Sequence, residues 1–183
     1  MILCFDIGGS RIKAARAQGG AMLPLGELAT PTQDFAAFVA ALAGFRGADR
    51  GIAISVAGVV DPASGRIKVA NIPCLDGRDV AADLRAALGL PVLVLNDADC
   101  FVMAEVQAGS ARGKRNVFGI ILGTGVGGGL VLNGQLVSGA GGYAGEWGHG
   151  PVVEDPVLPC GCGQVGCLDT IGGARGLERL HLH

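Results

Sequence analysis

A histidine and three cysteines in the last quarter of the chain form the group of residues that points most clearly to metal chemistry. His149 is followed by Cys160, Cys162 and Cys167, with glycines between the cysteines. Three thiolates and one imidazole complete a closed tetrahedral set, which is typical of structural zinc, whereas a catalytic zinc keeps one position open. The glycines allow the thiolates to converge on one ion. Free structural thiols are the alternative, and the pattern favours zinc.

Two glycine-rich segments have the composition of phosphate-binding turns. The first is Asp6-Ile7-Gly8-Gly9-Ser10, and the second is Leu122-Gly123-Thr124-Gly125-Val126-Gly127-Gly128-Gly129. Backbone N–H groups in such turns can hold phosphate oxygens because no side chain blocks a close approach. Tight turns without a ligand are the alternative. Two segments of this kind, each with a hydroxyl from Ser10 or Thr124, favour phosphate binding.

The second segment also has the G-x-G-x-x-G spacing of dinucleotide-binding folds. Gly123, Gly125 and Gly128 match it, and Glu146 lies downstream where a ribose-binding acid would be expected. That fold requires a helix directly after the glycines, because the helix N-terminus binds the pyrophosphate. Residues 130–134 have instead the sequence of a hairpin. We therefore expect phosphate binding by a hairpin turn rather than a dinucleotide fold.

Asp97 is the candidate catalytic carboxylate. It follows Asn96 and the apolar segment 91–95, so a rigid strand would hold it at an exposed end. A cap for the helix that follows is the alternative. Because Asn96 and Asp97 are adjacent, one of them can cap the helix while the other contacts a ligand.

The order of the predicted elements indicates an α/β layer fold. Alternating apolar residues predict a hairpin of strands 2–5 and 11–17, and helical spacing predicts a helix from Phe35 to Gly44 with Thr32 as its N-cap. The other predicted elements are strands 52–56, 67–69, 91–95 and 117–122, helices 80–89 and 98–108, a hairpin of 130–132 with 135–137, and a C-terminal helix within 168–183.

The pattern of apolar strand, glycine-rich turn and second strand at residues 2–17 recurs at residues 117–132. This repeat indicates two lobes. We expect an N-terminal lobe over 1–112, with the first phosphate motif and Asp97, and the start of a second lobe over 113–183, with the second phosphate motif and the zinc-binding segment.

Composition excludes several classes of protein. Of 183 residues 50% are hydrophobic and 16% charged, so the chain can bury a core, unlike a disordered chain. A net charge of −2 provides no attraction for nucleic acid or an anionic membrane. The apolar stretch 117–132 is too short for a membrane helix, and Met1 to Asp6 do not resemble a secretion signal, so we expect a cytoplasmic protein. Packing is the expected role of Cys4, Cys74 and Cys100.

The order of these motifs resembles that of the ROK family of sugar kinases and repressors, within the actin-like, hexokinase-like ATPase superfamily. Residues 6–11 resemble its first phosphate motif, 95–100 its catalytic strand end, and 122–129 its second phosphate motif. Residues 145–149 with 160–169 resemble its sugar-binding and zinc signature. The resemblance implies the first lobe and an incomplete second lobe of that fold. It also implies ATP-dependent phosphorylation of a hexose or N-acetylhexosamine hydroxyl.

The resemblance assigns a role to each motif residue. Asp97 would be the general base that takes the proton of the sugar hydroxyl, and Asp6 would help to organise Mg²⁺ beneath the ATP phosphates. His149 would contact zinc with one ring nitrogen and sugar with the other. The implied sugar-binding residues are Asn71, Asn96, Glu146, His149 and Asp169. The implied phosphate and magnesium residues are Asp6, Gly8, Gly9, Ser10, Gly123, Thr124 and Gly125; the implied zinc ligands are His149, Cys160, Cys162 and Cys167. A homodimer is the implied assembly.

The sequence departs from the family pattern in two side chains and in length. Asp169 stands where the family usually has Glu, and Ser10 where it usually has Thr. The chain stops before the glycine-rich adenosine-binding segment of family kinases, so we expect the activity of these 183 residues to be impaired. N-acetylglucosamine and fructose are the expected substrates. The alternative is a non-catalytic sugar-binding or regulatory module derived from the family; a repressor would need DNA-binding helices before the first strand.

Overall fold

The computed structural model describes residues 1–182, and the chain forms two compact units, Met1–Asp97 and Ala98–His183. Helix α3 (Asp97–Ala108) begins at the boundary between them. Helix α3 packs on the sheet of the second unit, and the lobes expected over 1–112 and 113–183 stay a prediction.

The first unit is built on a five-stranded mixed sheet with the order β3-β2-β1-β4-β7. Its first three strands are antiparallel neighbours, whereas β1, β4 and β7 run parallel. The strands are β1 (Ile2–Ile7), β2 (Arg11–Gln18), β3 (Ala21–Ala29), β4 (Ile52–Val56) and β7 (Val92–Asn96). The predicted hairpin around Gly8 and Gly9 is confirmed, since Ile7 pairs with Ile12.

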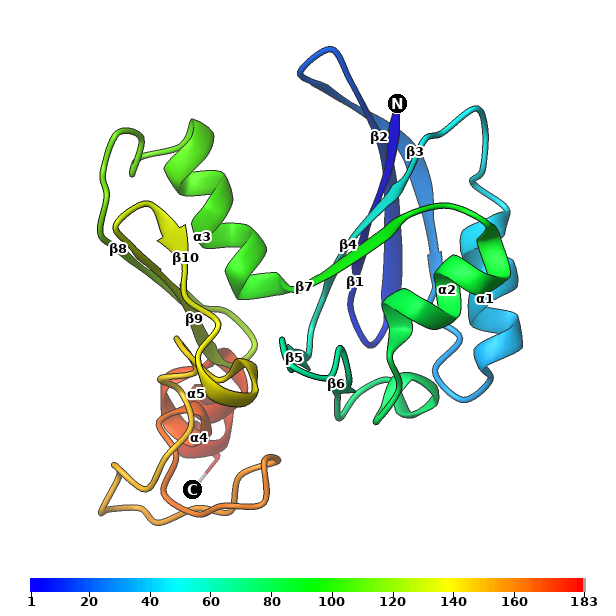
Figure 1. Ribbon diagram of the computed structural model, residues 1–183. Helices are drawn as coiled ribbons and strands as arrows, with labels where there is room; N and C mark the ends of the chain where they lie inside the picture. Colours follow the sequence, from blue (N-terminus) through cyan, green and yellow to red (C-terminus); the bar gives the residue numbers. More distant parts are fainter. Residues whose placement is uncertain (183) are drawn as a thin grey trace. The chain divides into compact units, whose positions relative to one another are not determined.

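Two helices, α1 (Phe35–Ala43) and α2 (Val80–Leu88), lie side by side on one face of this sheet (Figure 1). Alternate β1 residues, Leu3, Phe5 and Ile7, are buried in the core that the helices cover. Because side chains alternate along a strand, Asp6 projects from the opposite face. The hydrophobic periodicity of β1 therefore determines that a carboxylate is left on the open side of the sheet.

The sequence-based element assignment differs from the structure at three places in the first unit: the N-cap of α1, strand β3, and the two-residue strand β5 (Val59–Val60), which was not predicted. The N-cap of α1 is Asp34 rather than Thr32, because only a side chain directly before the first helical residue reaches the N–H groups of Ala36 and Ala37. Strand β3 was not predicted, since it is an exposed edge strand without alternation and contains Pro24. Three shorter elements complete the unit: β5 (Val59–Val60), β6 (Ile67–Lys68) and the 3₁₀ turn η1 (Pro73–Leu75).

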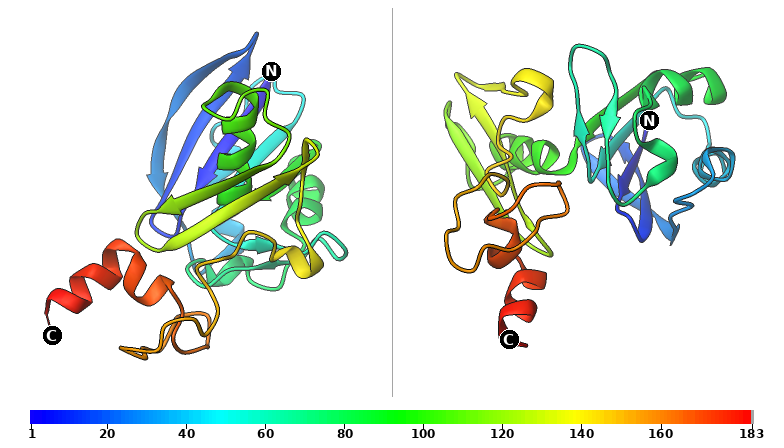
Figure 2. Two further views of the ribbon diagram at one scale, coloured as in Figure 1. Left: turned by 90° about the vertical axis from the view of Figure 1, so that its left-hand side faces the viewer. Right: turned by 90° about the horizontal axis from the view of Figure 1, so that it is seen from below.

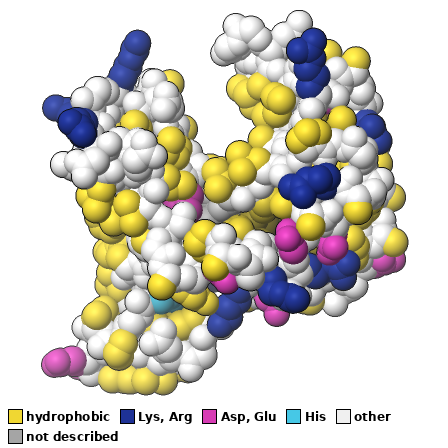
Figure 3. Space-filling model, in the orientation of Figure 1, with side chains coloured by type: hydrophobic (Ala, Val, Ile, Leu, Met, Phe, Trp, Pro, Cys, Tyr) yellow, Lys and Arg dark blue, Asp and Glu magenta, His cyan; other side chains and the backbone are white. Residues whose placement is uncertain are grey.

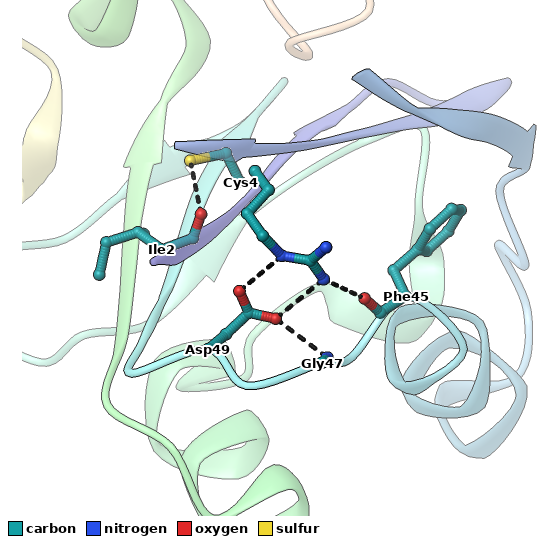
Figure 4. Close-up of polar contacts among 6 residues, drawn as sticks. Ile2, Cys4, Phe45, Gly47 and Asp49 are labelled. Carbon is teal, nitrogen blue, oxygen red and sulfur yellow. Dashed lines mark hydrogen bonds and ion pairs between the residues drawn. The ribbon is translucent and has the colours of Figure 1, made fainter. Parts of the chain in front are cut away.

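A partly buried ion pair ties the segment after α1 to the sheet (Figure 4). Arg16 of β2 donates from Nε to Asp49 Oδ1 at 2.7 Å and from Nη2 to Asp49 Oδ2 at 3.1 Å. The same Nη2 donates to the carbonyl of Phe45, and the Gly47 N–H donates to Asp49 Oδ2, both at 3.0 Å. The hydrogen bond from Arg16 holds the pKa of Asp49 below its usual value. This arrangement is structural, because both carboxylate oxygens of Asp49 and two of the three guanidinium nitrogens of Arg16 are hydrogen-bonded within the fold.

The second unit contains a three-stranded antiparallel sheet with the order β10-β9-β8. Helix α3 packs against it, and α4 and α5 follow at the end of the sheet where β9 begins (Figure 2). The elements are β8 (Val117–Leu122), β9 (Val126–Leu132), β10 (Gln135–Leu136), η2 (Ala140–Gly142), α4 (Asp169–Gly172) and α5 (Ala174–His181).

The strand β8 exposes an apolar face. Phe118, Ile120 and Leu122 alternate along it and remain 47%, 51% and 65% exposed, and Figure 3 shows apolar side chains on the surface over β8. No helix among residues 1–182 combines the length and apolar character that crossing a bilayer requires.

Candidate functional site: two glycine turns, a strand-end aspartate and a histidine–cysteine cluster

The first glycine turn connects β1 and β2. It closes through a hydrogen bond from the Gly8 N–H to the Arg11 carbonyl at 3.0 Å. The Thr30 hydroxyl donates to the Gly8 carbonyl at 2.7 Å and holds the turn from the position directly after β3. Within residues 1–182, no hydrogen-bond acceptor is described for the N–H groups of Gly9 and Ser10. Two successive N–H groups are therefore available to an anion at this turn.

Asn71, a predicted sugar-binding residue, lies directly over the first glycine turn. A Cβ atom added to Gly9 would lie 2.7 Å from the Cβ atom of Asn71, which is shorter than real contacts of this kind. Glycine at position 9 is thus required for Asn71 to approach the turn. The fold brings together two residues that are far apart in the sequence.

Asp6, the predicted magnesium residue, has two polar neighbours on the open face of the sheet. Ser55 Oγ donates to Asp6 Oδ1 at 3.4 Å, and Lys13 Nζ lies 4.0 Å from Asp6 Oδ2. Both neighbours stand opposite Asp6 in the strand register. Asp6 and Lys13 remain more than half exposed, so the pair is accessible and weak in water. Sequence reasoning missed Lys13 and Ser55, which only the pairing of β1 with β2 and β4 reveals.

Asn96 and Asp97 stand at the carboxyl end of β7, as the sequence predicted. Asn96 is buried, and its Nδ2 donates to the Gly58 carbonyl at 3.1 Å. Asp97, the next residue, is exposed and is the first residue of α3. The buried amide anchors the chain immediately before the carboxylate, which limits how far Asp97 can move.

The second glycine turn connects β8 and β9. It closes through a hydrogen bond from the Gly123 N–H to the Gly125 carbonyl at 3.0 Å. The first N–H groups of α5, those of Ala174 and Arg175, donate to the carbonyls of Gly123 and Thr124 at 2.8 and 3.3 Å. Over the described part of the chain, the N–H groups of Thr124 and Gly125 have no described acceptor. The second turn thus presents two successive N–H groups, as the first turn does.

The remaining glycines of this motif have a different role from the one expected. Gly127, Gly128 and Gly129 belong to strand β9, not to the turn. A Cβ atom on Gly129 would lie 2.6 Å from the Val102 side chain of α3, and one on Gly128 would lie 2.8 Å from the Trp147 ring. These two glycines allow close packing on both faces of β9, since any side chain would separate the layers.

The predicted metal ligands converge. The ligand atoms of His149, Cys160, Cys162 and Cys167 all lie within 4.8 Å of one another. Cys160 Sγ lies 3.5 Å from His149 Nδ1, and Cys162 Sγ lies 3.7 Å from Cys167 Sγ. A tetrahedral zinc ion with ordinary bond lengths requires about 3.6 Å between sulfur and nitrogen ligands and about 3.8 Å between two sulfurs. The donor set and its spacing therefore fit a tetrahedral zinc ion.

The thiols of this cluster differ in acidity. Burial raises the pKa of Cys160 to about 11. For Cys162 burial also acts to raise the pKa, but the backbone N–H of Gln164 and the thiols of Cys160 and Cys167 outweigh it, and the pKa falls to about 7. Since the thiolate is the form that binds metals, Cys162 is prepared for coordination near neutral pH.

A tight turn places Glu146 beside His149 in the chain. The His149 N–H donates to the Glu146 carbonyl at 3.1 Å, which is the spacing of one turn rather than of a continuous helix. Between them, Trp147 donates from Nε1 to the Gly127 carbonyl at 2.6 Å and packs edge-on against Phe118. Trp147, which the sequence did not single out, therefore fixes this segment to the sheet.

Asp169, predicted to bind sugar, follows the last cysteine. Its N–H donates to the Gly148 carbonyl at 2.9 Å, and its Oδ1 accepts a hydrogen bond from the Val126 N–H at 2.7 Å. At least one of its carboxylate oxygens is therefore committed to the backbone at the start of β9.

Comparison with known protein families matches residues 2–182 to the ROK family. The chain belongs to the ROK family. The family assignment covers both glycine turns, Asp97 and the histidine–cysteine cluster.

Two curated ROK relatives are sugar kinases. The chain is 40% identical to an N-acetylgalactosamine kinase from Shewanella sp. (strain ANA-3), over 96% of this chain and 62% of that protein. It is 36% identical to an N-acetyl-D-glucosamine kinase from Vibrio cholerae serotype O1, over 98% of this chain and 65% of that protein. The chain thus spans slightly less than two thirds of the length of these relatives.

Solved structures of ROK proteins show the same fold. The hexokinase from Thermus thermophilus superposes with a TM-score of 0.80 and 31% identity, over 98% of this chain and 62% of that one. The glucokinase from Streptomyces griseus, solved with glucose and AMPPNP, superposes with a TM-score of 0.81 and 32% identity, over 97% and 59%. The predicted actin-like, hexokinase-like ATPase fold is confirmed for the part that this chain spans.

Proposed function

We propose that this ROK protein transfers the γ-phosphoryl group of ATP to a hydroxyl of a hexose or N-acetylhexosamine. The observation that carries the proposal is the pair of glycine turns, each with two successive N–H groups that have no described acceptor in the protein. Polyphosphate oxygens are well suited to such N–H groups. Enzymes that transfer phosphoryl groups mainly position the reactants and neutralise charge, and backbone N–H donors contribute to both tasks.

Asp97 is the proposed general base. Its carboxylate accepts the proton of the sugar hydroxyl while the hydroxyl oxygen forms a bond to the γ-phosphorus and the bond from that phosphorus to the ADP oxygen breaks. The exposed position of Asp97, one residue after the anchored Asn96, supports this role. Asn71, Asn96, Glu146 and His149 are the proposed sugar contacts.

Asp6 is the proposed magnesium residue. Carboxylate oxygens are the ligands that Mg²⁺ prefers, and the Asp6 carboxylate stands on the open face of the sheet next to the first glycine turn. Bound Mg²⁺ would neutralise charge on the ATP phosphates. Lys13 would add a second positive charge on the same face, which also supports the binding of a polyphosphate.

The histidine–cysteine cluster is the proposed structural zinc site. The distances between its donor atoms and the closed set of four ligands support zinc, and the set keeps no position open for a substrate. The zinc would hold the segment that carries Glu146 and His149 against residues 160–167. Metal analysis of the purified protein should find about one zinc per chain. The predicted cytoplasmic location and homodimer stay predictions.

A coupled assay with ATP, Mg²⁺ and a panel of sugars tests the function. The panel contains N-acetylgalactosamine and N-acetylglucosamine, named for the curated relatives, together with glucose, fructose and N-acetylmannosamine. We expect sugar-dependent ADP release by the 183-residue chain to be impaired, because the sequence stops before the adenosine-binding segment of family kinases. Asp97→Asn should lower kcat by about 10²–10⁴ and change sugar affinity by no more than a few-fold, because the amide keeps the shape but cannot accept the proton.

Glu178→Gln, which neutralises an exposed carboxylate on α5, is the matched control and should keep wild-type turnover. Wild-type turnover by the Asp97→Asn variant would place the base elsewhere. Sugar binding without ADP release by the wild-type protein would favour a non-catalytic sugar-binding module.

A further inference from the structure

Asp169 joins two parts of the second unit that the proposed function treats as separate. Its side chain reaches the second glycine turn, where Oδ1 accepts from the Val126 N–H at 2.7 Å. Its own N–H reaches the histidine–cysteine segment, where it donates to the Gly148 carbonyl at 2.9 Å. We propose that Asp169 is a positioning residue that holds the second glycine turn in place and makes its geometry depend on the metal cluster. The proposal rests on the proposed role of this turn in binding ATP phosphates.

The turn is built around the Asp169 carboxylate. A Cβ atom on Gly125 would lie 2.3 Å from Asp169 Oδ1, so only glycine at this position admits the carboxylate oxygen. The oxygen satisfies the N–H of Val126, which follows the turn and opens β9. A hydrogen bond to a charged acceptor is stronger than one between neutral groups. Loss of this hydrogen bond would allow Val126 to move, and Val126 directly follows the two residues whose N–H groups are available to phosphate.

The residues that position Asp169 are themselves next to metal ligands. Cys167 is fully buried, and its carbonyl accepts from the N–H and the hydroxyl of Thr170 at 3.0 and 2.7 Å, which fixes the first turn of α4. Gly148, which accepts from the Asp169 N–H, precedes His149. The backbone around Asp169 is therefore held by Cys167, itself a proposed metal ligand, and by Gly148, which is adjacent to the proposed ligand His149. A metal ion that fixes His149 and Cys167 would fix Asp169 as well.

This arrangement predicts effects on nucleotide rather than on sugar. Asp169 Oδ1 is hydrogen-bonded to the backbone of β9, and the Asp side chain, which is shorter than the Glu of the family pattern, keeps the oxygen there. The expectation from the family pattern, in which Asp169 contacts sugar, would instead predict effects on sugar affinity. The two readings can be separated because they change different kinetic constants.

Three substitutions of Asp169 test the proposal by hydrogen exchange and kinetics. Asp169→Ala should raise the amide exchange of Gly123 and Val126, whose N–H groups are hydrogen-bonded, about tenfold and the KM for ATP by a similar factor, with the sugar KM changed less than twofold. Asp169→Asn retains an oxygen acceptor and should restore most of both properties. Asp169→Glu moves the oxygen past the Val126 N–H and should resemble the alanine variant. Glu178→Gln on α5 is the matched control, and its exchange over residues 123–126 should be unchanged.

Chelation tests the dependence on metal. Removing zinc from the wild-type protein should increase exchange at the hydrogen-bonded amides of Gly123 and Val126 and leave that of Gly8 in the first unit unchanged. A rise in the sugar KM with unchanged exchange would overturn the proposal in favour of a sugar contact. Unchanged exchange in the chelated protein, or no metal in the purified protein, would overturn the link to the cluster. Because exchange is measured without turnover, a protein that lacks kinase activity would contradict the proposed function and still test Asp169.

Discussion

The two glycine turns present similar backbone donors but are held by different kinds of neighbours. The first is anchored within its own sheet, by the Thr30 hydroxyl on the Gly8 carbonyl and by the Thr30 N–H on the Ser10 carbonyl at 3.1 Å. The second is anchored from outside its hairpin, by the first N–H groups of α5 and by the Asp169 carboxylate. One turn therefore depends on strand pairing, and the other on a segment that follows the metal ligands.

Two turns that present similar backbone donors can thus have separate sources of stability. A hairpin turn determines which N–H groups point outward, but the neighbours determine how firmly they are held. Perturbing the metal cluster should disturb the second turn alone, and perturbing β3 should disturb the first turn alone.

The largest expected effect comes from removing a metal ligand. Cys162→Ala leaves three ligands and an open position, so zinc should fall from about one per chain to nearly none. The second unit should then lose protection from hydrogen exchange, whereas the core of the first unit should keep it. Cys4→Ala in β1 is the control and should retain full zinc. Full retention of zinc by the Cys162 variant would contradict the ligand assignment.

A smaller effect is expected from filling the space beside the second turn. In Gly125→Ala the new methyl group would meet Asp169 Oδ1 at 2.3 Å and force the carboxylate away, so the KM for ATP should rise by about tenfold or more. Gly127→Ala is the matched control, since no atom lies within 4 Å of its added Cβ, and it should change this KM less than twofold. Equal effects of the two substitutions, measured in the coupled assay, would show that the Asp169 contact is unimportant.

The smallest effect is expected at the first turn. Thr30→Val removes the hydroxyl that donates to the Gly8 carbonyl but keeps the backbone contact with Ser10, so the KM for ATP should rise only a few-fold. The increase should be the same with and without chelator, because this turn does not contact the metal segment. Thr32→Val is the control. It removes a hydroxyl whose contact with Gln33 lies at the surface, and this variant should behave like the wild type. If chelator changed the increase in the KM for ATP that Thr30→Val causes, the two turns would not be anchored independently.

The local features of this protein follow from short stretches of its amino-acid sequence. Apolar alternation and glycine pairs predicted both hairpins, because side-chain periodicity and permitted φ values are properties of a few neighbouring residues. The position of Asp97 after a buried strand and the spacing of the four metal ligands were readable for the same reason. The order of these motifs also identified the family. Local patterns could not predict β3, which is exposed on both faces and leaves no alternating signal.

Only the tertiary structure decided which distant residues became neighbours. The glycines at 128 and 129 looked like part of a phosphate turn, but contacts with Trp147 and Val102 make them packing positions. The fold places Asp169 Oδ1 on the Val126 N–H, 43 positions away in the chain, and no local pattern marks that contact. Such contacts depend on how strands and helices pack, and packing is set by the whole core rather than by any one segment. The sequence thus determined which groups could do chemistry, and the packing decided which of them hold one another in place.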